Sequence, residues 1–162
     1  MSTVSGLAVP YNMPTIIAGM GGEVFLGPSP FGDIKSLPTI TAQKQHSTPD
    51  LIGSTASGSL RLIEQLDGLH YEIDLPANDP LTAELVARGD LAGASFAFSV
   101  APGGAKWEMS PNGMAIRIIS QADLYEVSLV STPAYPTTTA MMRAEPTAAE
   151  SRELMALSLI HI

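Results

Sequence analysis

Apolar and polar residues alternate in several short runs along the chain, with the two-residue period of a half-buried β-strand. Stretches that contain Gly and Pro separate these runs, as is typical of strands joined by turns. The pattern predicts strands at residues 3–10, 23–26, 39–46, 59–65, 69–75, 94–100, 105–109, 114–120 and 124–130. Residues 11–22 read as a loop, and residues 47–50 as a turn that ends the strand at His46.

Two pairs of runs are joined by tight-turn signals. Asp67-Gly68 lies between the runs at 59–65 and 69–75, and Asn112-Gly113 lies between those at 105–109 and 114–120. Glycine accepts a positive φ without steric cost, so both dipeptides favour a reversal of the chain. The sequence therefore predicts two β-hairpins.

A single internal helix is expected between the first hairpin and the strand at 94–100. Asp79-Pro80 is a helix cap followed by proline at the first helical position. Leu81, Leu85 and Val86 then recur at helical spacing, and Gly89 is suited to end the helix. The helix leads the chain into the strand at 94–100.

The composition changes at Arg143, which predicts a domain over residues 1–143 and a C-terminal helical arm or linker over 144–162. Residues 147–150 fit a capping box, and Leu154, Leu157 and Leu159 continue a helical pattern. Many short strands with one or two helices predict a mostly β, α+β fold. A small closed or nearly closed β-barrel is the first expectation, and an open two-layer α+β fold is the alternative.

Composition and charge narrow the possible functions. The 162 residues carry a net charge of −8, from 8 Lys and Arg against 16 Asp and Glu, which argues against a basic surface for nucleic acid or anionic membrane. The chain has no Cys, so it lacks a disulfide framework and a thiolate nucleophile. The sequence has no His pair at ligand spacing and no Gly-rich loop that opens a helix. It therefore predicts neither a metal site nor a bound cofactor. With neither a signal-peptide pattern nor a membrane-length apolar run, we expect a cytoplasmic protein.

Ser95 is the first candidate for chemistry. In the strand at 94–100, Ala94, Phe96, Phe98 and Val100 share one face, and the opposite face is small and polar. Next to Gly93, a hydroxyl at position 95 has the room that a nucleophile needs. The alternative is that Ser95 is an ordinary strand residue.

A serine nucleophile needs a base, because its hydroxyl is not ionised at neutral pH. His46, expected at a strand end, can take and return a proton there; the alternative is a polar residue that closes the strand. His70 alternates with Leu69 and Tyr71 and is expected to face solvent, and His161 lies beyond the domain.

The base needs a third group that holds its tautomer. Glu126 lies in an otherwise apolar strand, where we expect Tyr125, Val127 and Leu129 on one face and Glu126 and Ser128 on the other. Asp123, just before the strand, competes for the role. A solvated position of Glu126 is the alternative reading.

Taken together, these segments resemble the prohead (capsid maturation) serine proteases of tailed bacteriophages. The match covers residues 3–143 in the family's order. The segments that carry it are SGLAVPYN (5–12), QHSTPDLIG (45–53), LRL (60–62) to LHYEIDLP (69–76), LVARGDLAGASFAF (85–98) and LYEVSLVSTPAY (124–135). The chain departs from the family pattern at Gln45, where Asn is frequent, and at Ser47, where an acidic residue is common.

The resemblance implies that Ser95 is the nucleophile, His46 its base and Glu126 the third member, in a barrel like that of the herpesvirus assembly proteases. The implied activity is a serine endopeptidase that works through an acyl-enzyme. Its partners would be the major capsid protein with its scaffold segment and the protease itself, with 143–146 as a self-processing boundary. It would act inside the procapsid in the host cytoplasm, or be prophage-encoded in a bacterial cytoplasm, and a homo-oligomer stays open. The alternatives are a catalytically silent β-barrel that binds scaffold or capsid protein, and an unrelated β domain.

Overall fold

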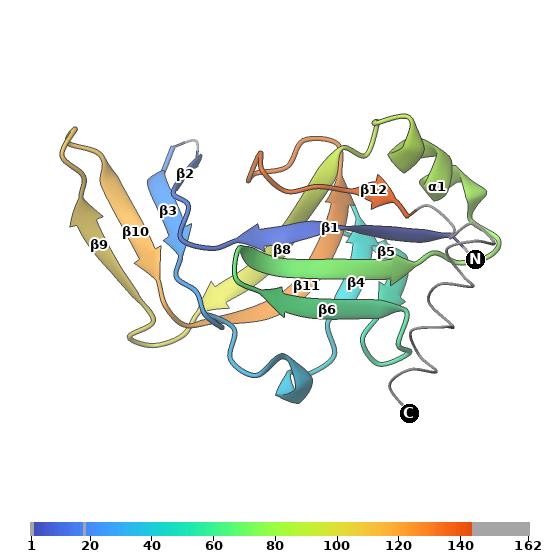
Figure 1. Cartoon of the computed structure of the whole chain (residues 1–162), viewed down its shortest axis with the longest axis horizontal. Coiled ribbons are helices and arrows are strands. Elements are labelled where there is room, and N and C mark those ends of the chain that lie inside the picture. Colours follow the sequence, from blue (N-terminus) through green and yellow to red (C-terminus); the bar gives the residue numbers. More distant parts are fainter. Residues whose placement is uncertain (1, 18, 144–162) are drawn as a thin grey trace, which may run out of the picture.

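The computed structural model describes residues 2–17 and 19–143 and consists mostly of short strands (Figure 1). The elements in chain order are β1 (Thr3–Pro10), β2 (Thr15–Ile17), β3 (Gly21–Phe25), the 3₁₀ turn η1 (Ile34–Ser36), β4 (Thr41–Lys44), β5 (Ser47–Ser54), β6 (Leu60–Gln65), β7 (Gly68–Asp74), α1 (Pro80–Ala87), β8 (Gly93–Val100), β9 (Ala105–Met109), β10 (Ala115–Ile119), β11 (Ala122–Val130) and β12 (Met141–Met142). The predicted mostly β fold is thus confirmed.

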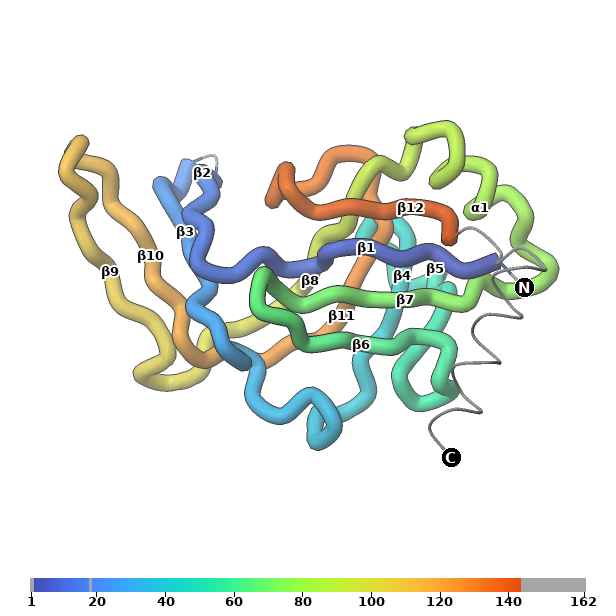
Figure 2. Tube along the Cα trace, viewed as in Figure 1, coloured from blue at the N-terminus to red at the C-terminus, as the bar shows by residue number. Residues whose placement is uncertain are grey.

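The strands pair into three four-stranded sheets, in the orders β12-β1-β7-β6, β2-β3-β10-β9 and β5-β4-β11-β8. Figure 2 shows the second sheet extending away from the other two. In the described part of the chain the ladders do not join into one closed ring, so the expected barrel closure is not confirmed and stays a prediction.

An aromatic cluster joins the second and third sheets. The Phe25 ring of β3 lies 5.3 Å from the Phe96 ring and 5.0 Å from the Phe98 ring of β8, both edge-on. Edge-to-face contacts of this kind add to the free energy gained by burying the rings. Phe31 and Tyr135 pack at the edges of the same cluster. The apolar face of β8 is therefore fixed against the core, which leaves its opposite face for polar groups.

The elements with strong local signals form as predicted. β6 pairs with β7, and β9 pairs with β10, each antiparallel. Gly113 adopts a φ of +84°, the left-handed conformation expected of the Asn-Gly turn. Helix α1 is capped by Asp79, whose carboxylate accepts a hydrogen bond from the Thr82 amide at 3.2 Å. None of the helices in residues 2–17 and 19–143 is long and apolar enough to cross a membrane.

Three expectations at the local level are wrong. The loop expected at 11–22 contains β2 and the start of β3, whose apolar runs are too short to be seen as alternation. Residues 47–50, expected as a turn, open β5, and β4 ends at Lys44 rather than at His46. The two-residue strand β12, which pairs with β1, was not expected. The helix expected at 144–162 lies outside the described residues.

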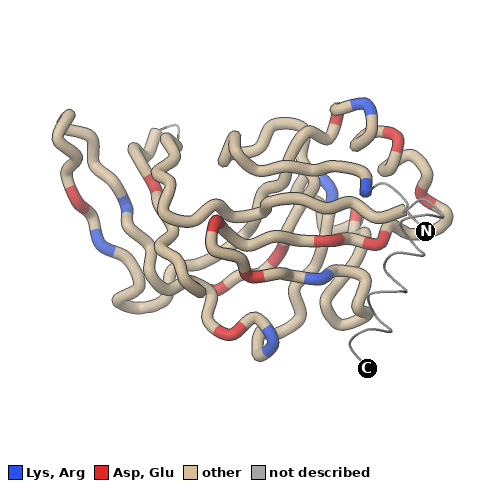
Figure 3. Tube along the Cα trace, viewed as in Figure 1, with Lys and Arg blue, Asp and Glu red and all other residues tan. Residues whose placement is uncertain are grey.

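Charged residues lie along β6 and β7 (Figure 3). Arg61 forms ion pairs with Glu72 and Asp74. Its guanidinium donates to Asp74 at 2.7 and 2.9 Å and to Glu72 at 3.2 Å. The hydrogen bonds from Arg61, with smaller help from Thr3, lower the pKa of Asp74 to about 2. A carboxylate whose pKa is lower in the folded than in the unfolded chain stabilises the fold above pH 4, and that stability is lost as the pH falls towards 2.

We therefore expect Asp74→Asn to lower the free energy of unfolding at pH 7 by about 1 kcal/mol, after allowing for the partial exposure of the pair. The difference from the native protein is expected to shrink as the pH falls from 4 to 3. Urea unfolding at several pH values measures it. Asp90→Asn, which breaks an exposed pair with Arg88, is the control and is expected to change little. A pH-independent loss in Asp74→Asn would contradict the linkage.

Candidate active site

The sheet β5-β4-β11-β8 brings the candidate residues onto one face. Across the antiparallel β8–β11 ladder, Ser95 lies opposite Ser128, and Ala97 lies opposite Glu126. Directly opposed residues of neighbouring strands share a face of the sheet. Ser95, Glu126 and Ser128 therefore lie on the same face, and Phe96 and Val127, which also form a pair, lie on the core side.

A β-bulge in β11 puts Glu126 on that face. Leu124 pairs with Phe98, and Glu126 pairs with Ala97, so Tyr125 is an extra residue without an opposite partner. Leu124 before the bulge and Val127 after it are both buried, although they are three positions apart and would lie on opposite faces of a regular strand. The extra residue reverses the alternation, as bulges beside functional sites often do.

The bulge corrects one expectation about β11. Tyr125 does not share the buried face of Val127 and Leu129, because 51% of it is exposed. Its hydroxyl instead makes a hydrogen bond with the Ser99 hydroxyl across the ladder. The expected common face of Glu126 and Ser128 is present.

His46 lies in a two-residue turn between β4 and β5. Lys44 pairs with Ser47, so Gln45 and His46 alone reverse the chain. Their φ angles are +52° and +54°, in the left-handed region that residues other than glycine seldom adopt. Two such residues in sequence are typical of the tight hairpin turns that match the twist of the strands.

The turn brings the His46 ring into contact with Glu126. Nδ1 of His46 and Oε1 of Glu126 form a hydrogen-bonded pair. The His46 side chain is 41% exposed and that of Glu126 only 10% exposed. When Nδ1 carries the proton and donates it to the carboxylate, the lone pair of a neutral ring lies on Nε2. This nitrogen is then able to accept a proton.

Of the two carboxylates that the sequence left open, only Glu126 contacts His46 in the described residues. Asp123 is exposed and lies opposite Ser99, at the other end of the ladder. His70 makes a hydrogen bond of 2.8 Å with Asp67 beside the first hairpin turn, apart from the site. His161 lies outside the described part of the chain.

Ser95 is half-buried near the start of β8, where a loop closes against the strand. A Cβ on Gly93 would lie 2.9 Å from Pro133 Cγ and 3.0 Å from Thr138 Oγ1, so only glycine permits this approach. Thr138 Oγ1 accepts a hydrogen bond from the Ala94 amide at 3.2 Å and donates to the Ala94 carbonyl at 2.7 Å. The backbone directly before Ser95 is thereby fixed.

The structure brings His46 and Glu126 into contact, and the strand register places Ser95 on the same face of the sheet, opposite Ser128. Among the described residues, no hydrogen bond joins the Ser95 hydroxyl to the His46 ring. Such bonds are often long in unliganded enzymes and shorten when substrate is bound.

The sequence reasoning missed two residues that touch the pair. Ser128 donates to Glu126 Oε2 at 3.3 Å, and Gln45 shares the turn with His46. The available signal for Ser128 was its place two residues after Glu126 on the same face. Gln45 stood out only as a departure from the family pattern next to His46.

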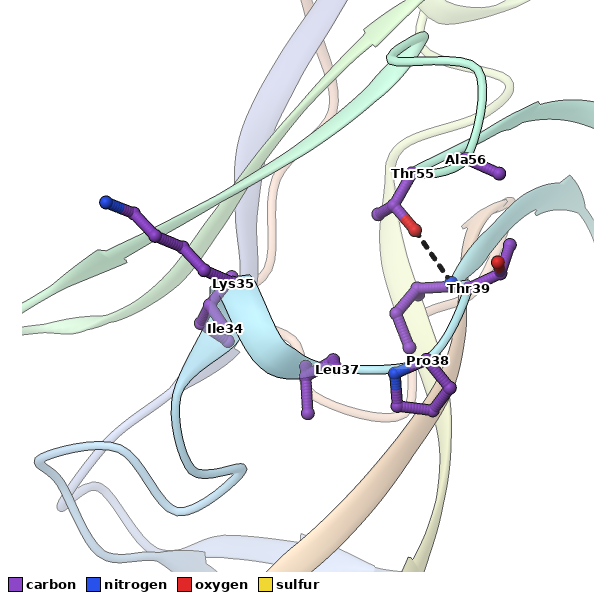
Figure 4. A pocket seen from close by; sticks show the side chains of 8 residues that line it. Ile34, Lys35, Leu37, Pro38, Thr39, Thr55 and Ala56 are labelled. Atoms are coloured by element: carbon purple, nitrogen blue, oxygen red, sulfur yellow. Dashed lines mark hydrogen bonds between the residues drawn. The ribbon is translucent and has the colours of Figure 1, made fainter.

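A hollow of about 320 Å³ lies elsewhere on the surface (Figure 4). It is lined by residues between Ile34 and Ile40 and by Thr55 and Ala56, with Thr55 Oγ1 accepting a hydrogen bond from the Ile40 amide at 2.9 Å. It contains none of Ser95, His46 and Glu126. The candidate site is therefore a feature of the sheet face and not of this hollow.

The chain can be compared with curated proteins and with solved structures. No curated protein matches the chain. Among solved structures, a crystal structure of KSHV protease in complex with a hexapeptide phosphonate inhibitor is similar, with a TM-score of 0.49 and 14% identity over 96% of this chain and 75% of that chain.

The family comparison covers nearly the whole chain. The model of the caudovirus prohead serine protease family matches residues 1–153. This range includes all of the strands that carry the polar face described above. The resemblance noted in the sequence is confirmed: the chain belongs to the caudovirus prohead serine protease family and is a serine peptidase.

Proposed function

We propose that this chain is the endopeptidase that cleaves the scaffold segment of the major capsid protein during prohead maturation, and that it also cleaves itself. Ser95 is the nucleophile, His46 the general base and Glu126 the carboxylate that orients His46. The observation that carries the assignment is the contact between Nδ1 of His46 and the buried Glu126, on the sheet face that also bears Ser95.

The proposed reaction follows the chemistry of these groups. Ser95 Oγ attacks the carbonyl carbon of the scissile peptide bond, while Nε2 of His46 takes the hydroxyl proton. The Glu126 carboxylate stabilises the imidazolium that forms. The same proton passes to the leaving amine when the C–N bond breaks, which leaves an acyl-enzyme on Ser95. Water, activated by His46, then hydrolyses the ester.

Membership of the family implies capsid or scaffold substrates and action in a prohead. We place the activity inside the procapsid in the host cytoplasm, or in a bacterium that carries the phage as a prophage. For self-cleavage we propose residues 143–146, where the composition changes between a catalytic domain at 1–143 and an arm or linker at 144–162.

Labelling with a fluorophosphonate tests the nucleophile without knowledge of the cleavage sequence. Such reagents phosphonylate a serine hydroxyl that a neighbouring base activates. We expect the native protein to gain one adduct, which peptide mass mapping locates to Ser95, and the urea-unfolded protein to gain none. An adduct on another serine would reassign the nucleophile. Unlabelled native protein that also leaves the capsid protein intact would favour a silent scaffold-binding protein.

A further inference from the structure

The turn that carries His46 is held by the C-terminal end of β11. The Gln45 amide donates to the Leu129 carbonyl at 2.9 Å, and the His46 amide donates to Ser128 Oγ at 3.2 Å. Both turn residues adopt positive φ angles, which are strained for residues other than glycine. A conformation of this kind persists only when its neighbours hold it.

The Gln45 side chain supplies a second anchor. Its Nε2 donates to Ser131 Oγ at 3.0 Å, and its Oε1 accepts from the Ser131 amide at 3.1 Å. Two opposed hydrogen bonds to one residue restrict both the position and the rotation of the amide. The exposed end of the turn is thus tied to the residue that follows β11.

Ser128 connects the backbone of the turn to the carboxylate. It is fully buried, with 0% of its surface exposed. Its Oγ accepts from the His46 amide, and its hydroxyl donates to Oε2 of Glu126 at 3.3 Å. One hydroxyl donates once and accepts twice, so both bonds are compatible. Because Oε1 contacts the His46 ring, the two oxygens of Glu126 have separate partners, and the carboxylate is fixed in rotation.

We propose that Ser128 is a positioning residue, which sets His46 and Glu126 at their mutual distance and orientation, with Gln45 as the outer anchor. The inference rests on the proposed roles of His46 and Glu126. Ser128 does not act as the nucleophile, because it is fully buried and is bonded to the main chain of His46 rather than to its ring. It acts on the reaction through its two neighbours.

The test compares Ser128→Ala, Ser128→Thr and a control, Ser99→Ala. Ser99 lies four residues along β8 from Ser95, and its hydroxyl bonds Tyr125. We expect Ser128→Ala to remain folded and to react with fluorophosphonate about 10²-fold more slowly, since small displacements of a base have effects of this size. Ser128→Thr, which keeps a hydroxyl, is expected to recover most of the rate, and Ser99→Ala to match the native protein.

Proton NMR supplies a readout that does not depend on activity. A proton shared between Nδ1 of His46 and Glu126 gives a resonance far downfield of the amide region. We expect this resonance in the native protein and in Ser128→Thr, and its loss by exchange with water in Ser128→Ala. If native protein is not labelled at Ser95, the proposed function fails, and this resonance still tests the positioning.

Two results would overturn the inference. One is a folded Ser128→Ala that labels at the native rate and keeps the downfield resonance. The other is a folded Ser128→Thr that is as slow as Ser128→Ala. Should Ser128→Ala fail to fold, Gln45→Ala at the exposed end of the turn tests the same arrangement, with an expected loss of about 10-fold in labelling rate. A native labelling rate in Gln45→Ala would then reject it.

Discussion

Replacing Ser95 by alanine is expected to lower kcat/KM for peptide-bond cleavage by at least about 10⁴-fold, because no acyl-enzyme forms without the hydroxyl. The side chain is small and half-buried, so the thermal unfolding midpoint is expected to change little. The measurement is incubation of purified native and variant proteins with the major capsid protein of the same phage, followed by electrophoresis over time. The band that corresponds to self-cleavage near residues 143–146 is expected to disappear as well.

Ser99→Ala is the matched control for this experiment. Ser99 is half-buried on the same strand as Ser95, and its hydroxyl makes a hydrogen bond with the Tyr125 hydroxyl. We expect it to cleave like the native protein. Cleavage by Ser95→Ala at the native rate would show that Ser95 is not the nucleophile, whatever the result for the control.

Replacing His46 by alanine is expected to lower kcat/KM by about 10⁴-fold, since Ser95 then has no base to take its proton. The His46 side chain is 41% exposed, so free imidazole is able to reach the vacated position. We expect added imidazole to restore part of the activity of His46→Ala and none of that of Ser95→Ala. The double variant is expected to be no slower than either single variant, because groups that act in one step are not additive.

His70→Ala provides the control for the second prediction. His70 also contacts a carboxylate, that of Asp67, but lies beside the first hairpin turn. It is expected to retain native activity. The assignment of the base would be wrong if His70→Ala lost activity while His46→Ala kept it.

Sequence reasoning succeeded where a signal is local. Asn112-Gly113 predicts the turn between β9 and β10, and Asp79-Pro80 predicts the start of α1, because each dipeptide favours one backbone conformation by itself. The turn at Gln45 and His46 was missed for the same reason. Neither residue favours a positive φ, and the neighbouring Ser-Thr-Pro-Asp run is a stronger local turn signal.

The site was predictable only in part. The resemblance named Ser95, His46 and Glu126, but the sequence did not decide between Glu126 and Asp123. The contact with His46 depends on the pairing of β4, β8 and β11, which is a property of three segments far apart in the chain. Ser128 was noticed only as a neighbour of Glu126 on one face, because its hydrogen bond to the His46 amide exists only after the turn has formed.

The bulge at Tyr125 makes β11 one residue longer than the stretch of β8 with which it pairs. A chain shortened by that residue would pair regularly: Glu126 would follow Leu124 directly, stay opposite Ala97 and keep its side of the sheet. The deletion would remove the hydroxyl contact with Ser99 and leave the carboxylate beside the imidazole. The site is therefore expected to tolerate the loss of this residue.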